Sequence, residues 1–147
     1  MISRAAKNAG LEVDFIFIVD DADPLRRVYP FLDEEYSRFI GHQIGNIPAP
    51  DENGKPDYQR FVDEGLNYAD YFLKPFLDAL ETIGVRPRIV KNLDAYRDGK
   101  FTDCSKIACD SAEQIREIIE RVSGRELPKN WFPWSPLDAN GSLEGVT

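Results

Sequence analysis

An apolar run followed at once by acidic residues is the feature that most constrains the fold of this chain. The run is Phe15–Val19, and Asp20, Asp21 and Asp23 come directly after it. Five consecutive apolar residues rich in Phe, Ile and Val are typical of a parallel strand that is buried on both faces. In open α/β sheets, ligands bind at the carboxyl ends of such strands. The sequence therefore predicts a buried strand over 12–19 that ends at a charged, ligand-binding edge.

Two other interpretations of this acidic cluster remain open. Asp23-Pro24 is a common way to open a turn, so the aspartates can also be solvated turn residues. Arg26 and Arg27 follow immediately, and ion pairs with them would fix the loop as a polar network. If the aspartates instead bind an ion, Mg²⁺ is expected, because it prefers carboxylates and substrate phosphates.

The composition narrows the class of protein. The 147 residues suit one domain, and the net charge of −8 argues against binding of a long nucleic-acid duplex, although a local basic patch stays open. Cys104 and Cys109 are too few for a disulfide scaffold and are expected to be small buried residues in a reducing cytosol. His42 is the only histidine, which excludes a site with several histidine ligands. No stretch approaches the roughly 20 apolar residues of a membrane span, so we expect a cytoplasmic protein without membrane contact.

Apolar periodicity and capping signals predict helices that alternate with two strands. The predicted helices span 2–9, 33–40, 58–83, 92–98, 102–109 and the stretch from Ser111 to Gly124, and the second strand spans 85–90. Asp57 is expected to cap the long helix and Pro75 to kink it. Ser111 with Gln114 predicts a capping box. A long helix between two strands allows them to run parallel, and such a crossover is normally right-handed. The predicted class is therefore α/β with a parallel sheet.

Three segments depart from this alternation. Residues 41–57 contain three prolines and three glycines, which predicts an insertion or a mobile lid. The chain opens on a helix, Gly10 and a strand, which is the second half of a βαβ unit, so we expect it to begin inside a fold. Asn140-Gly141 predicts the turn of a hairpin that continues past Thr147.

Further groups of polar and aromatic residues are candidates for binding. Residues 96–100, with sequence Tyr-Arg-Asp-Gly-Lys, follow the second strand as either a polar element at the sheet edge or a solvated turn. Trp131 and Trp134 either form a binding platform or pack against a domain edge. Residues 42–46, His-Gln-Ile-Gly-Asn, are superficially similar to the His-x-Gly-His signature of class I aminoacyl-tRNA synthetases. They lie in a loop and not at a strand-to-helix junction, so no catalytic role is assigned to them.

Four stretches, taken in order, resemble class I lysyl-tRNA synthetases. They are VDFIFIVDDADPLRRVYPFL (13–32), YFLKPFLDALETIG (71–84), YRDGKF (96–101) and EIIERVSGRELPKNWFPW (117–134). The most specific strings are Asp20–Leu32 and Val122–Pro128. The resemblance covers nearly the whole chain.

The resemblance implies a fold and a reaction. Members of this family activate lysine with ATP on a Rossmann-type domain and transfer it to the terminal adenosine of its tRNA, while a C-terminal helical domain reads the anticodon. Their HIGN-type signature is expected upstream of residue 1, and their KMSKS-type loop downstream of residue 147. The chain is thus expected to be an internal fragment of a lysine–tRNA ligase. Residues 1–124 would form a partial Rossmann-like core with flanking helices and a helical insertion, and 125–147 the start of a connecting insertion. Alone, it is expected to be inactive.

The resemblance also implies site residues and partners. Asp20, Asp21, Asp23 and Arg26 would shape the floor of the active-site cleft or the path of the acceptor stem, as substrate-binding and not catalytic residues. The implied partners are lysine, ATP with Mg²⁺, and tRNA. Many family members follow Trp-x-Pro with a zinc-binding Cys-x-x-Cys element, whereas this chain has Ser135–Ser142 there without cysteine, so zinc is not expected in this segment.

Two alternative functions stay open at this point. A strand that ends in Asp-Asp-x-Asp also resembles the metal-binding edge of nucleotide-sugar glycosyltransferases, where two carboxylates hold a divalent metal on a diphosphate. The chain can also be a non-catalytic, truncated synthetase-like module that binds a partner. A missing first strand would leave a sheet edge exposed, which favours self-association.

Overall fold

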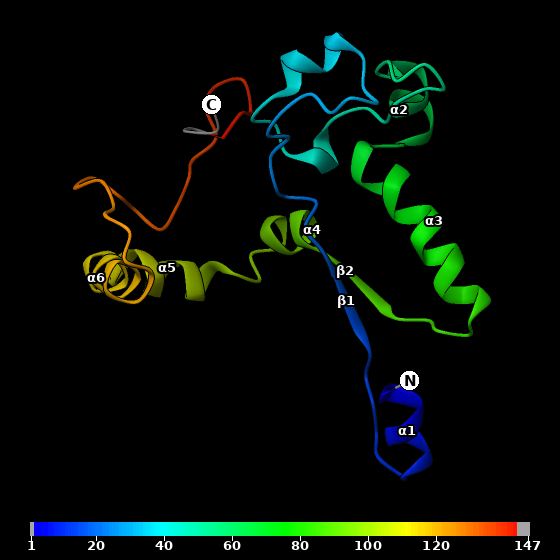
Figure 1. Cartoon of the computed structure of the whole chain (residues 1–147), viewed down its shortest axis with the longest axis horizontal. Coiled ribbons are helices and arrows are strands. Elements are labelled where there is room, and N and C mark those ends of the chain that lie inside the picture. Colours follow the sequence, from blue (N-terminus) through cyan, green and yellow to red (C-terminus); the bar gives the residue numbers. More distant parts are fainter. Residues whose placement is uncertain (1, 144–147) are drawn as a thin grey trace.

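The chain folds as helices arranged around a small parallel sheet, in a computed structural model that describes residues 2–143. In chain order the elements are α1 (Ile2–Asn8), β1 (Ile16–Val19), the 3-10 helices η1 (Glu34–Phe39) and η2 (Ile44–Asn46), α2 (Tyr58–Glu64), α3 (Tyr68–Thr82), β2 (Arg88–Lys91), α4 (Asn92–Arg97), α5 (Thr102–Asp110) and α6 (Ala112–Ser123). Figure 1 shows α1 beside the start of β1, and η1 and η2 beyond its other end. The predicted α/β class with a parallel sheet and flanking helices is confirmed.

The two strands pair in parallel, in register from Ile16 opposite Arg88 to Val19 opposite Lys91. Both are shorter than the predicted 12–19 and 85–90. Pairing begins where the main-chain N–H of Arg88 donates to Phe15 O at 2.8 Å. The residue before Arg88 is a proline, which has no N–H to extend the ladder.

The predicted burial of β1 on both faces is wrong. Phe17 packs on Phe76 of α3, with ring centroids 5.0 Å apart, and Val19 is buried. On the opposite face Ile16 is 42% exposed and Ile18 is 59% exposed. Successive side chains of a strand alternate between faces, so α3 covers one face of this two-stranded sheet and leaves the other open.

The predicted long helix over 58–83 is two helices. Asp57 caps α2, as expected, by accepting a hydrogen bond from the N–H of Arg60 at 3.0 Å. Gly65 then ends α2 in the left-handed conformation, with φ of +70°. Asn67 starts α3 by accepting from the N–H of Asp70 at 2.8 Å. The apolar periodicity continues through the break, which hides it from a pattern based on spacing alone.

Residues 41–57 are part of the core and not a free lid. The core cluster consists of Leu25, Leu32, Tyr36, Ile47 and Tyr68. Ile47 is fully buried, and the hydroxyl of Tyr36 donates to Pro48 O at 2.9 Å. Burial raises the pKa of Tyr36, because the phenolate would lose its hydration. The segment thus supplies both apolar and hydrogen-bonding partners to the core.

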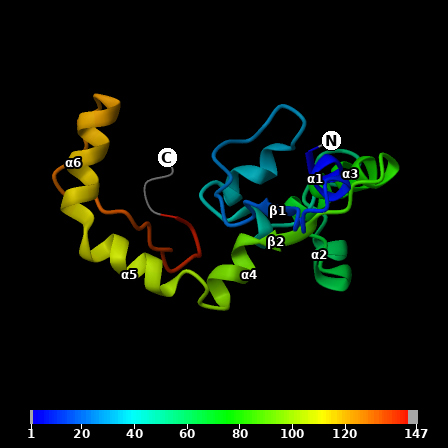
Figure 2. The same ribbon diagram turned by 90° about the horizontal axis from the view of Figure 1, so that it is seen from below.

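Helices α5 and α6 form an arm that lies apart from the sheet, beyond α4 (Figure 2). Cys104, expected to be buried, is exposed because α5 packs mainly against α6, and Cys109 is half-buried. The predicted capping box at Ser111 does not form. An N-cap residue normally has an extended backbone, but Ser111 has φ of −108° and ψ of 18°. The N–H of Ser111 donates to Ile107 O, at the end of the preceding helix. None of the helices between residues 2 and 143 is long and apolar enough to cross a membrane.

The C-terminal tail turns back to the rest of the chain. The predicted turn at Asn140-Gly141 is confirmed, since Leu137 and Leu143 form an antiparallel bridge on either side of it. Asp138 accepts the N–H groups of Ser142 and Asn140, which lowers the pKa of this carboxyl. The continuation of the hairpin past Thr147 lies outside the described residues. The tail is held to the core where the N–H of Leu143 donates to Gly41 O at 2.9 Å.

Candidate active-site cleft

The carboxyl ends of β1 and β2 lie at the same edge of the sheet. There, side chains of residues after β1 accept hydrogen bonds from residues after β2. The side chain of Asn92 donates to the carboxylate of Asp20 at 2.7 Å. The main-chain N–H of Leu93 donates to Oδ1 of Asp21 at 2.9 Å. Asp21 is only 3% exposed. The acidic residues after β1 therefore fix where α4 begins.

A second segment lies along the residues that follow β1. The N–H of Gly45 donates to Asp21 O, and the N–H of Ile44 donates to Asp23 O, both at 2.9 Å. Gly45 fits there because it has no side chain: a Cβ at this position would meet a methyl group of Leu93 and lie 3.1 Å from Asp21 O. Residues 41–46 are thereby placed against the sheet edge.

A cleft of about 620 Å³ opens at this edge. It is lined by Ala22, Asp23, Pro24, Gln43, Asn46, Asn92, Leu93, Tyr96, Arg97, Pro133, Trp134, Ser135, Leu137 and Leu143. Tyr96 and Trp134 are about half exposed, and their rings meet edge to face with centroids 6.3 Å apart. The cleft therefore joins the sheet edge, α4, residues 43–46 and the C-terminal tail.

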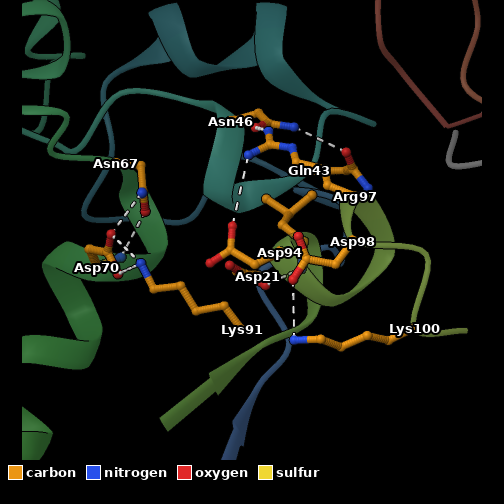
Figure 3. A network of polar contacts seen from close by, with 11 residues as sticks. Asp21, Gln43, Asn46, Asn67, Asp70, Lys91, Asp94, Arg97, Asp98 and Lys100 are labelled. Carbon is orange, nitrogen blue, oxygen red and sulfur yellow. Dashed lines mark hydrogen bonds and ion pairs between the residues drawn. The ribbon is translucent and has the colours of Figure 1, made fainter.

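Polar side chains of the cleft are held in a chain of hydrogen bonds (Figure 3). The guanidinium of Arg97 donates to Oδ1 of Asn46 at 2.8 Å, and the amide of Asn46 donates to Gln43 at 3.0 Å. Beside them, Lys91 at the end of β2 pairs with Asp70 of α3 at 2.6 Å. Aromatic faces can stack on a base, and a guanidinium suits a phosphate. Tyr96, Trp134 and Arg97 thus bring to the cleft two kinds of side chain that can contact a nucleotide.

The structure separates the four predicted site residues. Asp20 and Asp21 hold the start of α4, and Asp23 lines the cleft. Arg26 is exposed and is not a lining residue of the cleft. The open interpretation as an Asp–Arg network is wrong, because within residues 2–143 neither Arg26 nor Arg27 pairs with these acids. Arg27 instead lies over the ring of Tyr29, 5.2 Å from its centroid.

The metal-binding interpretation of the acidic cluster has no support in the part of the chain that the structure describes. No group of three or more His, Cys, Asp or Glu side chains is placed there to hold a metal ion. The carboxylate of Asp21 accepts a hydrogen bond from a main-chain N–H and that of Asp20 accepts one from an amide N–H, so an oxygen of each is already engaged in a hydrogen bond within the protein.

Sequence reasoning missed part of the cleft. Tyr96, Arg97 and Trp134 were recognised as candidates, but nothing in their spacing brings them together. Asn46 and Gln43 were missed because the loop around them was compared with a catalytic signature. The signal available was Gly45 between them, which allows a close backbone approach.

Comparison with known proteins gives the family. The model for tRNA synthetases class I (K) matches residues 1–143. The lysine–tRNA ligase of Thermoplasma acidophilum is 38% identical over 137 residues, which are 93% of this chain and 25% of that protein. That of Methanosarcina barkeri is 40% identical over 135 residues, 92% of this chain and 23% of that protein. That of Archaeoglobus fulgidus is 38% identical over 139 residues, which are 95% of this chain and 26% of that protein.

The chain spans about a quarter of the length of these curated relatives. The match nevertheless covers all of the elements described above, from α1 to the turn of the tail. The resemblance to class I lysyl-tRNA synthetases noted in the sequence is confirmed, and this chain belongs to the tRNA synthetases of class I (K).

Proposed function

We propose that this chain takes part in the ATP-dependent attachment of lysine to tRNA. The observation that carries the proposal is the cleft at the carboxyl edge of the sheet, within a region that is 38–40% identical to lysine–tRNA ligases. This edge is where α/β sheets bind their ligands. Lysine, ATP and tRNA are the proposed substrates, and a cytoplasmic location is proposed because tRNA is among them.

Within this proposal the predicted residues have different roles. Asp23 is a substrate-binding residue on the wall of the cleft. Asp20 and Asp21 are positioning residues, because they hold the segment that carries Tyr96. For Arg26, exposed outside the cleft, we propose contact with the acceptor stem. Mg²⁺ would arrive bound to the phosphates of ATP, as part of that substrate.

We also propose how the chain is divided. Residues 1–124 would form part of a Rossmann-type catalytic core, and 125–147 would begin a connecting region. The division is supported by Gly124, which ends α6 in the left-handed conformation with φ of +67°. The chain leaves the regular helices at this point and continues as the tail.

The cleft predicts a binding defect. We expect the purified chain to bind a non-hydrolysable lysyl-adenylate analogue in the presence of Mg²⁺, and Tyr96→Ala to weaken binding roughly tenfold. The reason is that stacking on an aromatic ring contributes about 1–3 kcal/mol per base. Isothermal titration calorimetry measures both affinities. Tyr71→Ala, which removes an exposed tyrosine of α3 outside the cleft, serves as the control. A folded chain that does not bind the analogue, or equal losses in both variants, would contradict the proposed site.

The open face of the sheet predicts self-association. We propose that Ile16 and Ile18 contact a second copy of the chain, together with the outer edges of the two strands, which no other strand within residues 2–143 pairs with. Ile18→Lys is expected to shift the protein to a monomer in size-exclusion chromatography with light scattering. Ile107→Lys, at a similarly exposed isoleucine of α5, is expected to leave the mass unchanged. A wild-type chain that is already monomeric at high concentration would refute this proposal.

A further inference from the structure

A second cavity, of about 310 Å³, lies at the opposite end of the sheet from the cleft. It is lined by Arg4, Lys7, Phe15, Ile83, Gly84, Val85 and Arg86. Three of these residues are cationic and none is acidic. We propose that this cavity binds a phosphate group, carried either by an RNA backbone or by a free phosphate or pyrophosphate ion.

The turn between α3 and β2 holds one of the cations in place. Nη2 of Arg4 donates to the main-chain carbonyls of Ile83 at 2.6 Å and Gly84 at 3.3 Å. Gly84 has φ of +70°, and a Cβ at this position would lie 2.7 Å from Nη2 of Arg4. The positive φ favours a glycine at this position, whereas the contact with Arg4 involves the end of a flexible side chain that can move aside. A guanidinium carries five N–H donors, so it can bind these carbonyls and still donate to an anion.

The charges of the other two cations are weakly compensated. Within residues 2–143, Lys7 forms no ion pair. Arg86 pairs with Glu81 at 2.7 Å, but both side chains are largely exposed, and such pairs are weak in water. Arg4 and Lys7 are three residues apart on α1 and so lie on the same face of that helix. A local excess of positive charge thus stands on a chain of net charge −8.

The walls of the cavity combine apolar and cationic side chains. Phe15, Ile83 and Val85 contribute the apolar surface, and because Phe15 is 43% and Ile83 is 61% exposed, the cavity is open to solvent. In Figure 1, α1 and the turn before β2 lie at the start of the strands, whereas α4 lies at their ends. The cavity is separate from the proposed active-site cleft and does not depend on that proposal.

The test measures phosphate binding by the full chain at low salt. Calorimetry is used for inorganic phosphate and pyrophosphate, and fluorescence anisotropy for a labelled single-stranded RNA. We expect Lys7→Gln and Arg86→Gln each to weaken binding about fivefold for at least one of these probes. The control Lys74→Gln removes a cation of α3 that is paired with Asp78 outside the cavity, and it is expected to change little.

The probes distinguish the two sources of phosphate. If RNA is the ligand, the slope of log K against log salt falls by about 0.7 for each phosphate contact removed, and pyrophosphate binds weakly. If a free anion is the ligand, calorimetry detects it and the loss in Lys7→Gln appears there. Failure of all three probes to bind the folded chain, or equal losses in Lys7→Gln and Lys74→Gln, would overturn the proposal. Lys7→Gln and Arg86→Gln lie outside the cleft and are expected to retain binding of the lysyl-adenylate analogue, so failure of this proposal is distinguishable from failure of the proposed function.

Discussion

Replacement of Gly54 by alanine is expected to lower the free energy of unfolding by about 3 kcal/mol. Gly54 has φ of +80°, where a side chain is strained. A Cβ there would also lie 2.5 Å from Phe31 O and 3.3 Å from the Cα of Leu32. Because these are backbone atoms, the contact cannot be relieved by rotation of a side chain. The hydrogen bond from the N–H of Asp33 to Gly54 O, 2.9 Å long, would be displaced as well.

Gly65 provides a matched control for this prediction. Its φ of +70° imposes similar backbone strain, but a Cβ there would meet nothing within 4 Å. Gly65→Ala is therefore expected to cost only about 1 kcal/mol. Urea unfolding followed by circular dichroism measures both values. Equal losses for the two variants would show that the close contact of Gly54 with residues 31–33 contributes nothing to stability.

Asp21→Ala is expected to destabilise the chain by about 2 kcal/mol, since it removes the acceptor of a buried N–H. The N–H of Leu93 would then lie unsatisfied at the start of α4. Leu93 is itself buried, so water cannot easily replace the carboxylate. Because α4 carries Tyr96 and Arg97, the same change should also weaken binding in the cleft.

Two further variants separate the role of this hydrogen bond from a general loss of charge. Asp21→Asn keeps an acceptor oxygen at the same place and is expected to retain most of the stability. Asp98→Ala removes an exposed carboxylate that pairs with Lys100 at 3.2 Å, and its effect should stay within about 0.5 kcal/mol. Denaturant midpoints give the three values. An Asp21→Asn variant as unstable as Asp21→Ala would contradict the assigned role.

The sheet edge was predictable because it depends on local order along the chain. Acidic residues directly after one parallel strand and the polar residues 96–100 after the next are expected at the same edge of the sheet. The Asp57 cap and the end of the last helix at Gly124 were predictable for the same reason, because each depends on residues within one or two turns.

The other parts of the fold and of the cleft depend on contacts between residues that are far apart in the sequence. Apolar periodicity gives no information about such contacts. Ile18 is exposed because no helix covers its face of the sheet within residues 2–143, and the apolar sequence of the strand gives no sign of this. Ile47 belongs to the core because Tyr36 and Tyr68 pack around it, although its loop is rich in proline and glycine. The break between α2 and α3 was signalled by Gly65 and Asn67, but the continuing apolar pattern outweighed this signal.

The central claim, that this chain serves lysine–tRNA ligation, is tested most directly by exchange into a relative. The matched residues of this chain would replace the corresponding region of the Archaeoglobus fulgidus lysine–tRNA ligase, and attachment of radiolabelled lysine to tRNA would be measured. We predict that the chimaera charges tRNA with lysine and that Tyr96→Ala in the chimaera lowers the rate roughly tenfold. A chimaera that folds, with a cooperative thermal transition, but attaches no lysine would contradict the account.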